Sequence, residues 1–252
     1  MRGIGGAGSL RAQIEAANAA AGLQKIEFNI AGSCTGTPHL ILLQSPLPDI
    51  TGSLEIDGYS EPETAANTLS DGSDAVLCIV IGAIGGPLEQ ALQVPAAAAA
   101  ATSLAVKGIA FTGNIGTFAV ALRLAGGSHH VVQGNAFAGV GPGAIGSLGE
   151  LGFGIQVSDS VQNVLIGGAV PEHRNSFGAM NNSAITLSGA SSGGHTIQNN
   201  YIGLTASGVS ASPIGSGIHA FNSSDVQILD NVISSVGNNE AIRITGASAT
   251  GY

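Results

Sequence analysis

The amino-acid sequence predicts an all-β fold, a parallel β-solenoid in which short strands stack coil upon coil, and three observations predict it. The first is a repeat: an apolar pulse recurs in "AVALRL", "GIQVSD", "AITLSG", "GIHAFN" and "AIRITG". Its anchors are Val120, Ile155, Ile185, Ile218 and Ile242, at intervals of 35, 30, 33 and 24 residues. A period of about 30 residues with two or three β pulses is typical of one solenoid turn.

The other two observations are the composition and the alternation of side chains. The chain has 39 Gly, no Trp and only 9% charged residues, which favours short β segments joined by Gly-rich turns over helical repeats. Alternation within "GIHAFN" places Ile218 and Ala220 inward and His219 and Phe221 outward. Each coil can then bury its apolar face only by stacking on its neighbours.

A polar residue recurs beside the apolar pulses. Asn135, Asn175, Asn200 and Asn231 are each followed, two places on, by Phe or Ile. Asparagine tolerates left-handed turn conformations and bonds to nearby backbone. We therefore expect these side chains to form a hydrogen-bonded ladder inside the coil, with a structural rather than a chemical role.

The N-terminal third is expected to begin with a helix over residues 9–22. Ser9 is a plausible N-cap, Leu10, Ile14, Ala17 and Ala21 share one face, and Gly22 is the expected stop. Such an amphipathic helix would cover the open end of the solenoid.

The rest of the chain divides into early and regular coils within one domain, residues 1–252. Strands are expected at "KIEFNI", "HLILLQ", "SLEIDG" and "AVLCIVI" within the first coils, residues 23–93. The low-complexity run "VPAAAAAATS" is expected to be a loop, and residues 104–252 form regular coils. No signal peptide opens the sequence and it stops just after "AIRITG", so we expect a fragment of a longer protein. An uncapped C-terminal coil would favour self-association.

The composition also limits which partners the protein can bind and which states its cysteines can adopt. The net charge is −9 with seven basic residues, which argues against a nucleic-acid partner, and no apolar run approaches the roughly 20 residues of a membrane helix. Cys34 and Cys78 permit one disulfide or two free thiols. Because Cys78 lies in the apolar run "VLCIV", we expect a packed, inert thiol there.

The segments "GSLRAQIEAAN", "IEFNI", "SPLPDITGSLEIDGYSEP" and "DAVLCIVI" resemble the start of bacterial parallel β-helix repeat proteins that carry a CSLREA-type motif. Here Gly8 replaces the motif's Cys, and "RAQI" replaces the usual acidic "REAI". The later "GI…NVI" repeats look like the carbohydrate-binding and sugar-hydrolase repeats of the same pectin-lyase-like group. The resemblance implies a right-handed parallel β-helix, a secreted or cell-surface location, and polysaccharide binding, polysaccharide cleavage or adhesion.

The outward positions of the sheet formed by the first pulse are the surface on which pectin-active relatives place their sites. By the repeat these positions are Ala121/Arg123, Gln156/Ser158, Thr186/Ser188, His219/Phe221 and Arg243/Thr245. We predict catalytic roles for His219, Glu240 and Arg243, since His and Glu exchange protons and Arg holds carboxylates. Predicted substrate contacts are Arg123, Gln156, Thr186, Phe221 and Asp230.

Three function hypotheses follow. The first is a protein that binds a polysaccharide or cell-surface glycan and can also cleave it. The second is a non-catalytic structural or adhesive spacer, which the lack of Trp and of a polygalacturonase-like acidic pair favours. The third is a hydrolase of a small ester or phosphoester.

Three other patterns have weaker chemical meaning. The acids Glu55, Asp57, Glu61, Glu63, Asp71 and Asp74 lie in one segment, where oxygen ligands suit calcium, although their spacing matches no calcium loop. "GASSG" at residues 189–193 fits G-x-S-x-G with His195 behind it, but it joins two strands, so we do not expect Ser191 to be a nucleophile. Adjacent His129 and His130 would point to opposite faces of a strand, which argues against a zinc site.

Overall fold

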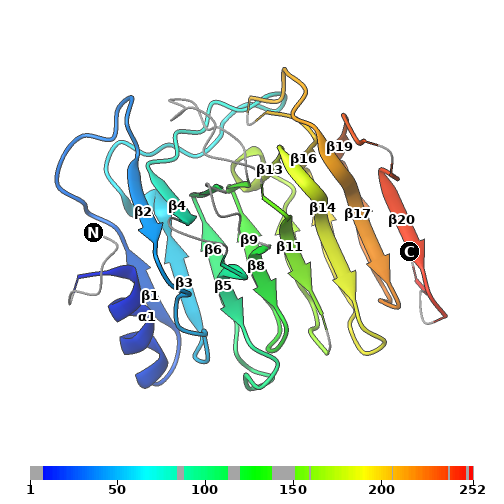
Figure 1. The fold of residues 1–252 in the computed structure, drawn as a ribbon, viewed down its shortest axis with the longest axis horizontal. Helices are drawn as coiled ribbons and strands as arrows, with labels where there is room; N and C mark the ends of the chain where they lie inside the picture. The colour runs from blue at the N-terminus through cyan, green and yellow to red at the C-terminus, as the bar shows by residue number, and fades with distance from the viewer. Residues whose placement is uncertain are drawn as a thin grey trace.

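The computed structural model describes residues 8–83, 88–112, 120–137, 151–158, 160–205, 207–237, 239–247 and 250–251. Most of the described elements are strands, and they form three parallel sheets (Figure 1). The chain passes from sheet A to sheet B to sheet C and back to sheet A, so each complete coil adds one strand to every sheet. This stacking of parallel strands is compatible with the expected parallel β-helix.

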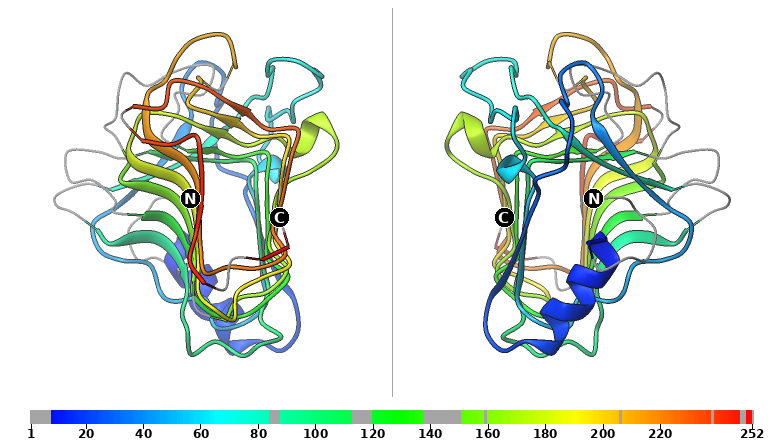
Figure 2. Two further views of the ribbon diagram at one scale, coloured as in Figure 1. Left: turned by 90° about the vertical axis from the view of Figure 1, so that its right-hand side faces the viewer. Right: turned by 90° about the vertical axis from the view of Figure 1, so that its left-hand side faces the viewer.

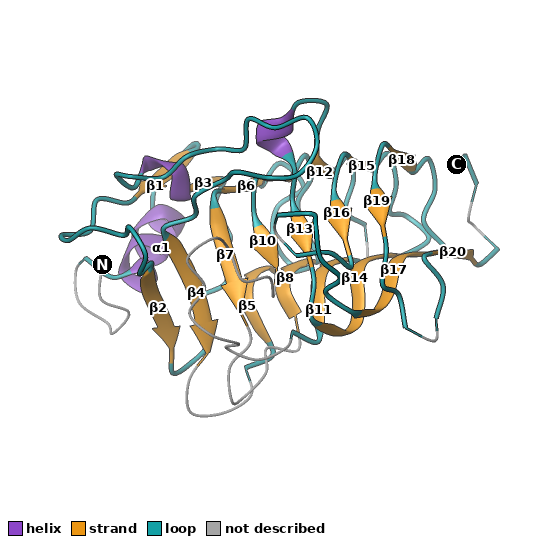
Figure 3. Ribbon diagram, turned by 90° about the horizontal axis from the view of Figure 1, so that it is seen from above, coloured by secondary structure: helices purple, strands orange, loops and turns teal. Residues whose placement is uncertain are grey.

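Sheet A and sheet B each contain seven strands in the described residues. Sheet A consists of β1 (Gln24–Glu27), β3 (Leu54–Asp57), β6 (Leu104–Lys107), β9 (Val131–Gln133), β12 (Leu165–Gly167), β15 (Thr196–Gln198) and β18 (Gln227–Leu229). Sheet B consists of β2 (His39–Leu43), β4 (Ile79–Ala83), β7 (Ile109–Thr112), β10 (Ala136–Phe137), β13 (Ser176–Phe177), β16 (Tyr201–Ile202) and β19 (Val232–Ile233), which follow one another in Figure 3.

Sheet C has six described strands and begins one coil later. It consists of β5 (Gln90–Val94), β8 (Val120–Leu124), β11 (Phe153–Val157), β14 (Met180–Ser188), β17 (Ile214–Phe221) and β20 (Ile242–Thr245). In the first coil the segment between β2 and β3 takes the place of such a strand. Its residue Ile50 donates its N–H to Gln93 O of β5 at 2.8 Å. Two short 3₁₀ turns, η1 (Gly58–Ser60) and η2 (Pro171–His173), interrupt the coils.

One continuous apolar core fills the space that the three sheets enclose (Figure 2). In-register residues stack from coil to coil: the rings of Phe111, Phe137 and Phe177 lie 5.1 and 4.7 Å apart, and all three are fully buried. As predicted, Ile218 and Ala220 point inward, with no exposed surface. The period of the sequence is therefore the period of the core.

The predicted asparagine ladder is present at the turn between sheets A and B. Asn135 N–H donates to Asn175 Oδ1 at 2.9 Å, Asn175 N–H to Asn200 Oδ1 at 3.3 Å, and Asn200 N–H to Asn231 Oδ1 at 2.9 Å. The side-chain amides donate along the same column and to backbone carbonyls of the preceding coil. Each buried amide thus has partners, which removes the cost of burying it.

The N-terminal helix, α1 (Leu10–Ala19), lies at one end of the stack, and β20 lies at the other (Figures 1 and 2). Ser9 is its N-cap, as predicted, and accepts from Ala12 N–H. Leu10, Ile14 and Ala17 are buried in the common core. The helix ends three residues before the expected stop at Gly22, because Ala20 is already extended, and Ala21 is exposed rather than packed.

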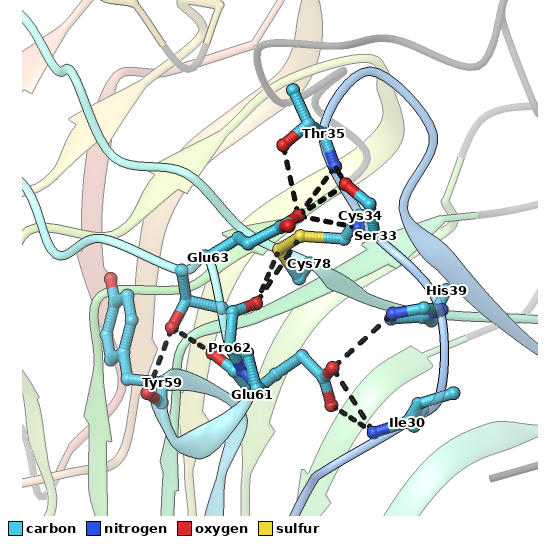
Figure 4. Close-up of a disulfide and its surroundings, with 11 residues drawn as sticks. Ile30, Ser33, Cys34, Thr35, His39, Tyr59, Glu61, Pro62, Glu63 and Cys78 are labelled. Carbon is cyan, nitrogen blue, oxygen red and sulfur yellow. Dashed lines mark hydrogen bonds and ion pairs between the residues drawn. A yellow bond between two sulfur atoms is a disulfide. The ribbon is translucent and has the colours of Figure 1, made fainter.

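The expected free thiol at Cys78 is wrong, because Cys34 and Cys78 form a disulfide with a Cα–Cα distance of 5.5 Å (Figure 4). Cys78 is buried, as its apolar surroundings indicated, but it lies just before β4 and faces the loop that carries Cys34. No helix within the described ranges is long and apolar enough to cross a membrane.

Candidate functional site

A row of polar side chains runs along the outer face of sheet C. Strand register places them side by side in successive coils, and we call this set the polar row: Gln93, Arg123, Gln156, Thr186, His219 and Arg243. Neighbouring strands lie about 4.8 Å apart, so Arg123 and Arg243, four strands apart, are separated along the stack by roughly 19 Å. Five members of the row, all except Gln93, were predicted as ligand contacts or catalytic residues from the repeat, and Gln156 and Arg123 lie directly opposite each other on adjacent strands.

The repeat count was wrong by two residues in one strand. Leu122, rather than Val120, pairs with Ile155. Ala121, expected to point outward, is fully buried. A slip of two residues keeps the inward and outward alternation, so Arg123 still lies on the outer face, opposite Gln156.

The three residues predicted to be catalytic gather at the C-terminal end of the row. His219 lies opposite Arg243 in the neighbouring strand. Arg243 NH1 is 3.9 Å from Glu240 Oε2, and both side chains are about half exposed. His219 Nε2 is 3.4 Å from Thr245 Oγ1. A base, a carboxylate and a guanidinium therefore face one patch of surface.

The environment of His219 favours its neutral form. Partial burial lowers the pKa of this imidazole, the charge of Arg243 lowers it further, and Glu240 opposes the shift. A neutral imidazole can accept a proton, which is the property that general base catalysis requires.

Two further predicted contacts differ in accessibility. Phe221 is 46% exposed on the same face of β17 as His219 and presents an apolar surface beside it. Thr186 lies within the row, but its hydroxyl is buried and has no hydrogen-bond partner among the described residues. A ligand reaches that hydroxyl only if a neighbouring side chain moves.

Asp230 does not join the polar row. It lies in the turn between β18 and β19, which belong to sheets A and B, and has a φ of 53°. Its carboxylate accepts from Gln198 Nε2 at 3.3 Å. The structure thus places this predicted contact on a different surface from His219.

The acids of the acidic segment point to separate partners. No three metal-ligating side chains converge in the described residues. Glu55 and Asp57 pair with Lys25 and Lys107 across β1, β3 and β6, at distances between 2.8 and 3.8 Å. The other acids of the segment bond to separate groups: Glu61 to Ile30 N–H, Glu63 to the loop at residues 33–35, Asp71 to Tyr201 and Asp74 to Thr68.

Two of these acids hold the loop beside the disulfide (Figure 4). Glu61 is 2% exposed, accepts from Ile30 N–H at 2.9 Å and lies 3.4 Å from His39 Nε2. Glu63 accepts from Ser33, Cys34 and Thr35, and these hydrogen bonds lower the pKa of its carboxyl. Sequence reasoning missed this anchoring role, because the partners come from the preceding coil.

The buried histidines have structural partners. Val164 N–H donates to His195 Nδ1 at 3.2 Å, so the proton of the neutral ring is on Nε2 and is donated to Ser192 Oγ at 2.8 Å. His195 in that tautomer cannot take a proton from Ser192, so it does not activate this serine as a nucleophile. His130 is bonded in the same way, with Leu104 N–H on Nδ1 and Gly126 O at Nε2.

In comparisons with known proteins, no family model, curated protein sequence or solved structure matches the chain.

Proposed function

We propose that the chain is a right-handed parallel β-helix of the pectin-lyase-like group, secreted or at the cell surface, which binds an extended acidic polysaccharide along the polar row. The observation that carries the proposal is the register of the row. Polar side chains repeat at each strand, and arginines occupy two positions roughly 19 Å apart. A stiff linear polymer with repeated carboxylates complements such an array, since guanidinium groups bind carboxylates in a bidentate manner.

Cleavage of the bound polymer is a second activity that the C-terminal end of the row supports. His219 is neutral enough to act as a base, and Arg243 would hold a substrate carboxylate beside it. Glu240 would orient Arg243 through their ion pair. Without such turnover the same row is a binding surface on a structural or adhesive spacer. The hydrolase of small esters or phosphoesters has less support, because the one buried Ser–His contact described above has the wrong tautomer.

Binding is tested with a polyuronate and a neutral glucan of similar length, measured by affinity electrophoresis or calorimetry. Wild-type protein should bind the polyuronate and not the neutral glucan. Arg123→Ala and Arg243→Ala should each weaken binding about tenfold or more, the loss of one charge-assisted contact. Arg11→Ala is the matched control and should bind like wild type, because Arg11 lies on α1, bonds to Ser45 and is not a member of the row. Equal affinity of all three variants would contradict the proposal.

Cleavage is tested on the same polymers by the appearance of new chain ends, with chromogenic ester and phosphoester substrates in parallel. His219→Ala should abolish turnover while leaving binding within a few-fold of wild type. If wild type binds the polymer and cleaves nothing, the row is a binding site on a spacer. Turnover that survives His219→Ala would place the chemistry on another surface.

A further inference from the structure

Residues 61–78, which we call the brace, leave the coil stack after η1 and rejoin it just before β4. Both ends of the brace are fixed to the preceding coil. Cys78 is joined to Cys34 by the disulfide, and Glu61 and Glu63 accept the hydrogen bonds shown in Figure 4. The middle of the brace is therefore a loop whose two ends lie close together.

This loop is held in shape by its own hydrogen bonds. The backbones of Ala65 and Val76 exchange two hydrogen bonds, at 3.1 and 2.8 Å. Nearer the tip, Asp74 accepts from Thr68 N–H at 2.7 Å, and Asn67 accepts from Asp74 N–H at 3.1 Å. The tip can therefore act as a rigid surface for contacts with other coils.

The tip contacts coils that are far away along the sequence. If coils are numbered by their strand in sheet A, the brace belongs to coil 2, η2 to coil 5 and β16 to coil 6. Arg174, which follows η2, donates to three backbone carbonyls of the tip at distances between 2.6 and 3.1 Å: Leu69, Ser70 and Gly72. It also donates to Asn199 Oδ1 at 2.8 Å, so one guanidinium joins coils 2, 5 and 6.

Tyr201, in β16, adds a second contact to the tip. The Arg174 guanidinium lies over its ring, 4.4 Å from the ring centroid. Its hydroxyl donates to Asp71 Oδ1 and accepts from Gly72 N–H, both at 2.8 Å. Arg174 is 8% exposed and Tyr201 is 4% exposed, so separating the tip from these two side chains would leave buried polar groups without partners.

These contacts lie at the turn between sheets A and B, where the asparagine ladder joins the same coils from inside. Arg174 immediately precedes Asn175, and Asn199 immediately precedes Asn200. Figure 1 shows the brace, in cyan, running along the stack toward β16. The brace thus reaches coils 5 and 6 from coil 2 without following the coil-to-coil path through coils 3 and 4.

We propose that the brace makes coils 2 to 6 open as one cooperative unit, with Arg174 as the residue that closes it. The inference concerns a different part of the molecule from the polar row and does not depend on the proposed function. In a solenoid whose coils contact only their neighbours, distant coils can open separately. Here coil 2 cannot separate from coils 5 and 6 without breaking the buried contacts of Arg174 and Tyr201.

Hydrogen exchange at increasing urea concentration, followed by mass spectrometry, tests the proposal because it reports the opening of each segment. In wild type, peptides from residues 54–60 and 176–202 should open at the same urea concentration. In Arg174→Met these two peptides should open at different urea concentrations, and residues 67–74 should exchange at least tenfold faster. Arg11→Met, which changes another arginine of the same protein, is the control and should keep the wild-type pattern. Separate opening in wild type, or common opening in Arg174→Met, would overturn the proposal.

A milder variant keeps the test decisive if Arg174→Met does not fold. Tyr201→Phe retains the ring beneath Arg174 and removes only the hydroxyl that bonds to Asp71 and Gly72. It should accelerate exchange in residues 67–74 and separate the opening of coil 2 from that of coils 5 and 6, to a smaller extent than Arg174→Met. Unchanged exchange of residues 67–74, or faster exchange there while the coils still open together, would show that the brace packs on the coils without coupling them.

Discussion

At the scale of single residues, buried asparagine side chains form hydrogen bonds between one coil and the next. Asn175 is fully buried, accepts from Asn135 and donates to Val132 O and Asn200 Oδ1. Leucine at this position leaves these groups buried and unpaired. We expect Asn175→Leu to destabilise the fold by about 3 kcal/mol or more, measured by urea denaturation. Asn231→Leu, at the partly exposed end of the ladder, should cost less than half as much; equal losses would contradict the ladder as the cause.

The buried His195 makes stability depend on pH. Burial, followed by the charge of His130, lowers its pKa in the folded state to about 4, whereas an unfolded imidazole has a pKa of about 6.5. The unfolded chain therefore binds a proton first as the pH falls. Full stability is present above about 6.5 and is lost as the pH falls toward 4, by about 2 kcal/mol between pH 7 and pH 5.

The variant His195→Gln separates this effect from other titrations, since an amide can accept from Val164 N–H and donate to Ser192. Its free energy of unfolding, measured at pH 7 and pH 5, should change less than that of wild type. His129→Gln, an exposed neighbour of the other buried histidine, is the matched control and should keep the wild-type difference. Identical pH dependence in His195→Gln and wild type would show that another group titrates.

At the scale of elements, the disulfide ties the loop before β2 to the entry of β4. The two cysteines are separated by 44 residues, and closing a loop of that length in the unfolded chain corresponds to about 4 kcal/mol of stabilisation. We expect the double variant Cys34→Ala/Cys78→Ala to lose about 2–4 kcal/mol. Reductant should destabilise wild type by a similar amount and leave the variant unchanged; a wild type insensitive to reductant would contradict this prediction.

Most of the elements could be predicted from the sequence, because helix and strand patterns are local. Ser9, Leu10 and Ile14 identify α1 without any knowledge of the rest, and "GIHAFN" identifies an alternating strand. The disulfide could not be predicted, because Cys34 and Cys78 meet only when one coil stacks on the next. The paired charges Lys25 and Glu55 were missed for the same reason.

At the scale of the whole molecule, the polar row could be predicted wherever the repeat interval in the sequence equals the number of residues between paired positions on adjacent strands. His219 and Arg243 were placed together by counting, and the structure places them in adjacent strands. Asp230 could not be placed by counting, because a turn residue with positive φ does not follow strand alternation. Glu61 and Glu63 were grouped with the other acids because they are close in sequence. The orientation of their side chains depends on hydrogen bonds to the preceding coil.

Because each coil adds one parallel strand to sheet C, side chains on its outer face repeat at a constant spacing. Neighbouring strands are about 4.8 Å apart, and this distance is set by backbone hydrogen bonding and does not depend on which side chain each strand carries. Duplication of a coil would add one strand to sheet C and lengthen the polar row by one position at the same spacing. Gain or loss of about 30 residues would thereby change the length of the polar row while leaving its spacing fixed.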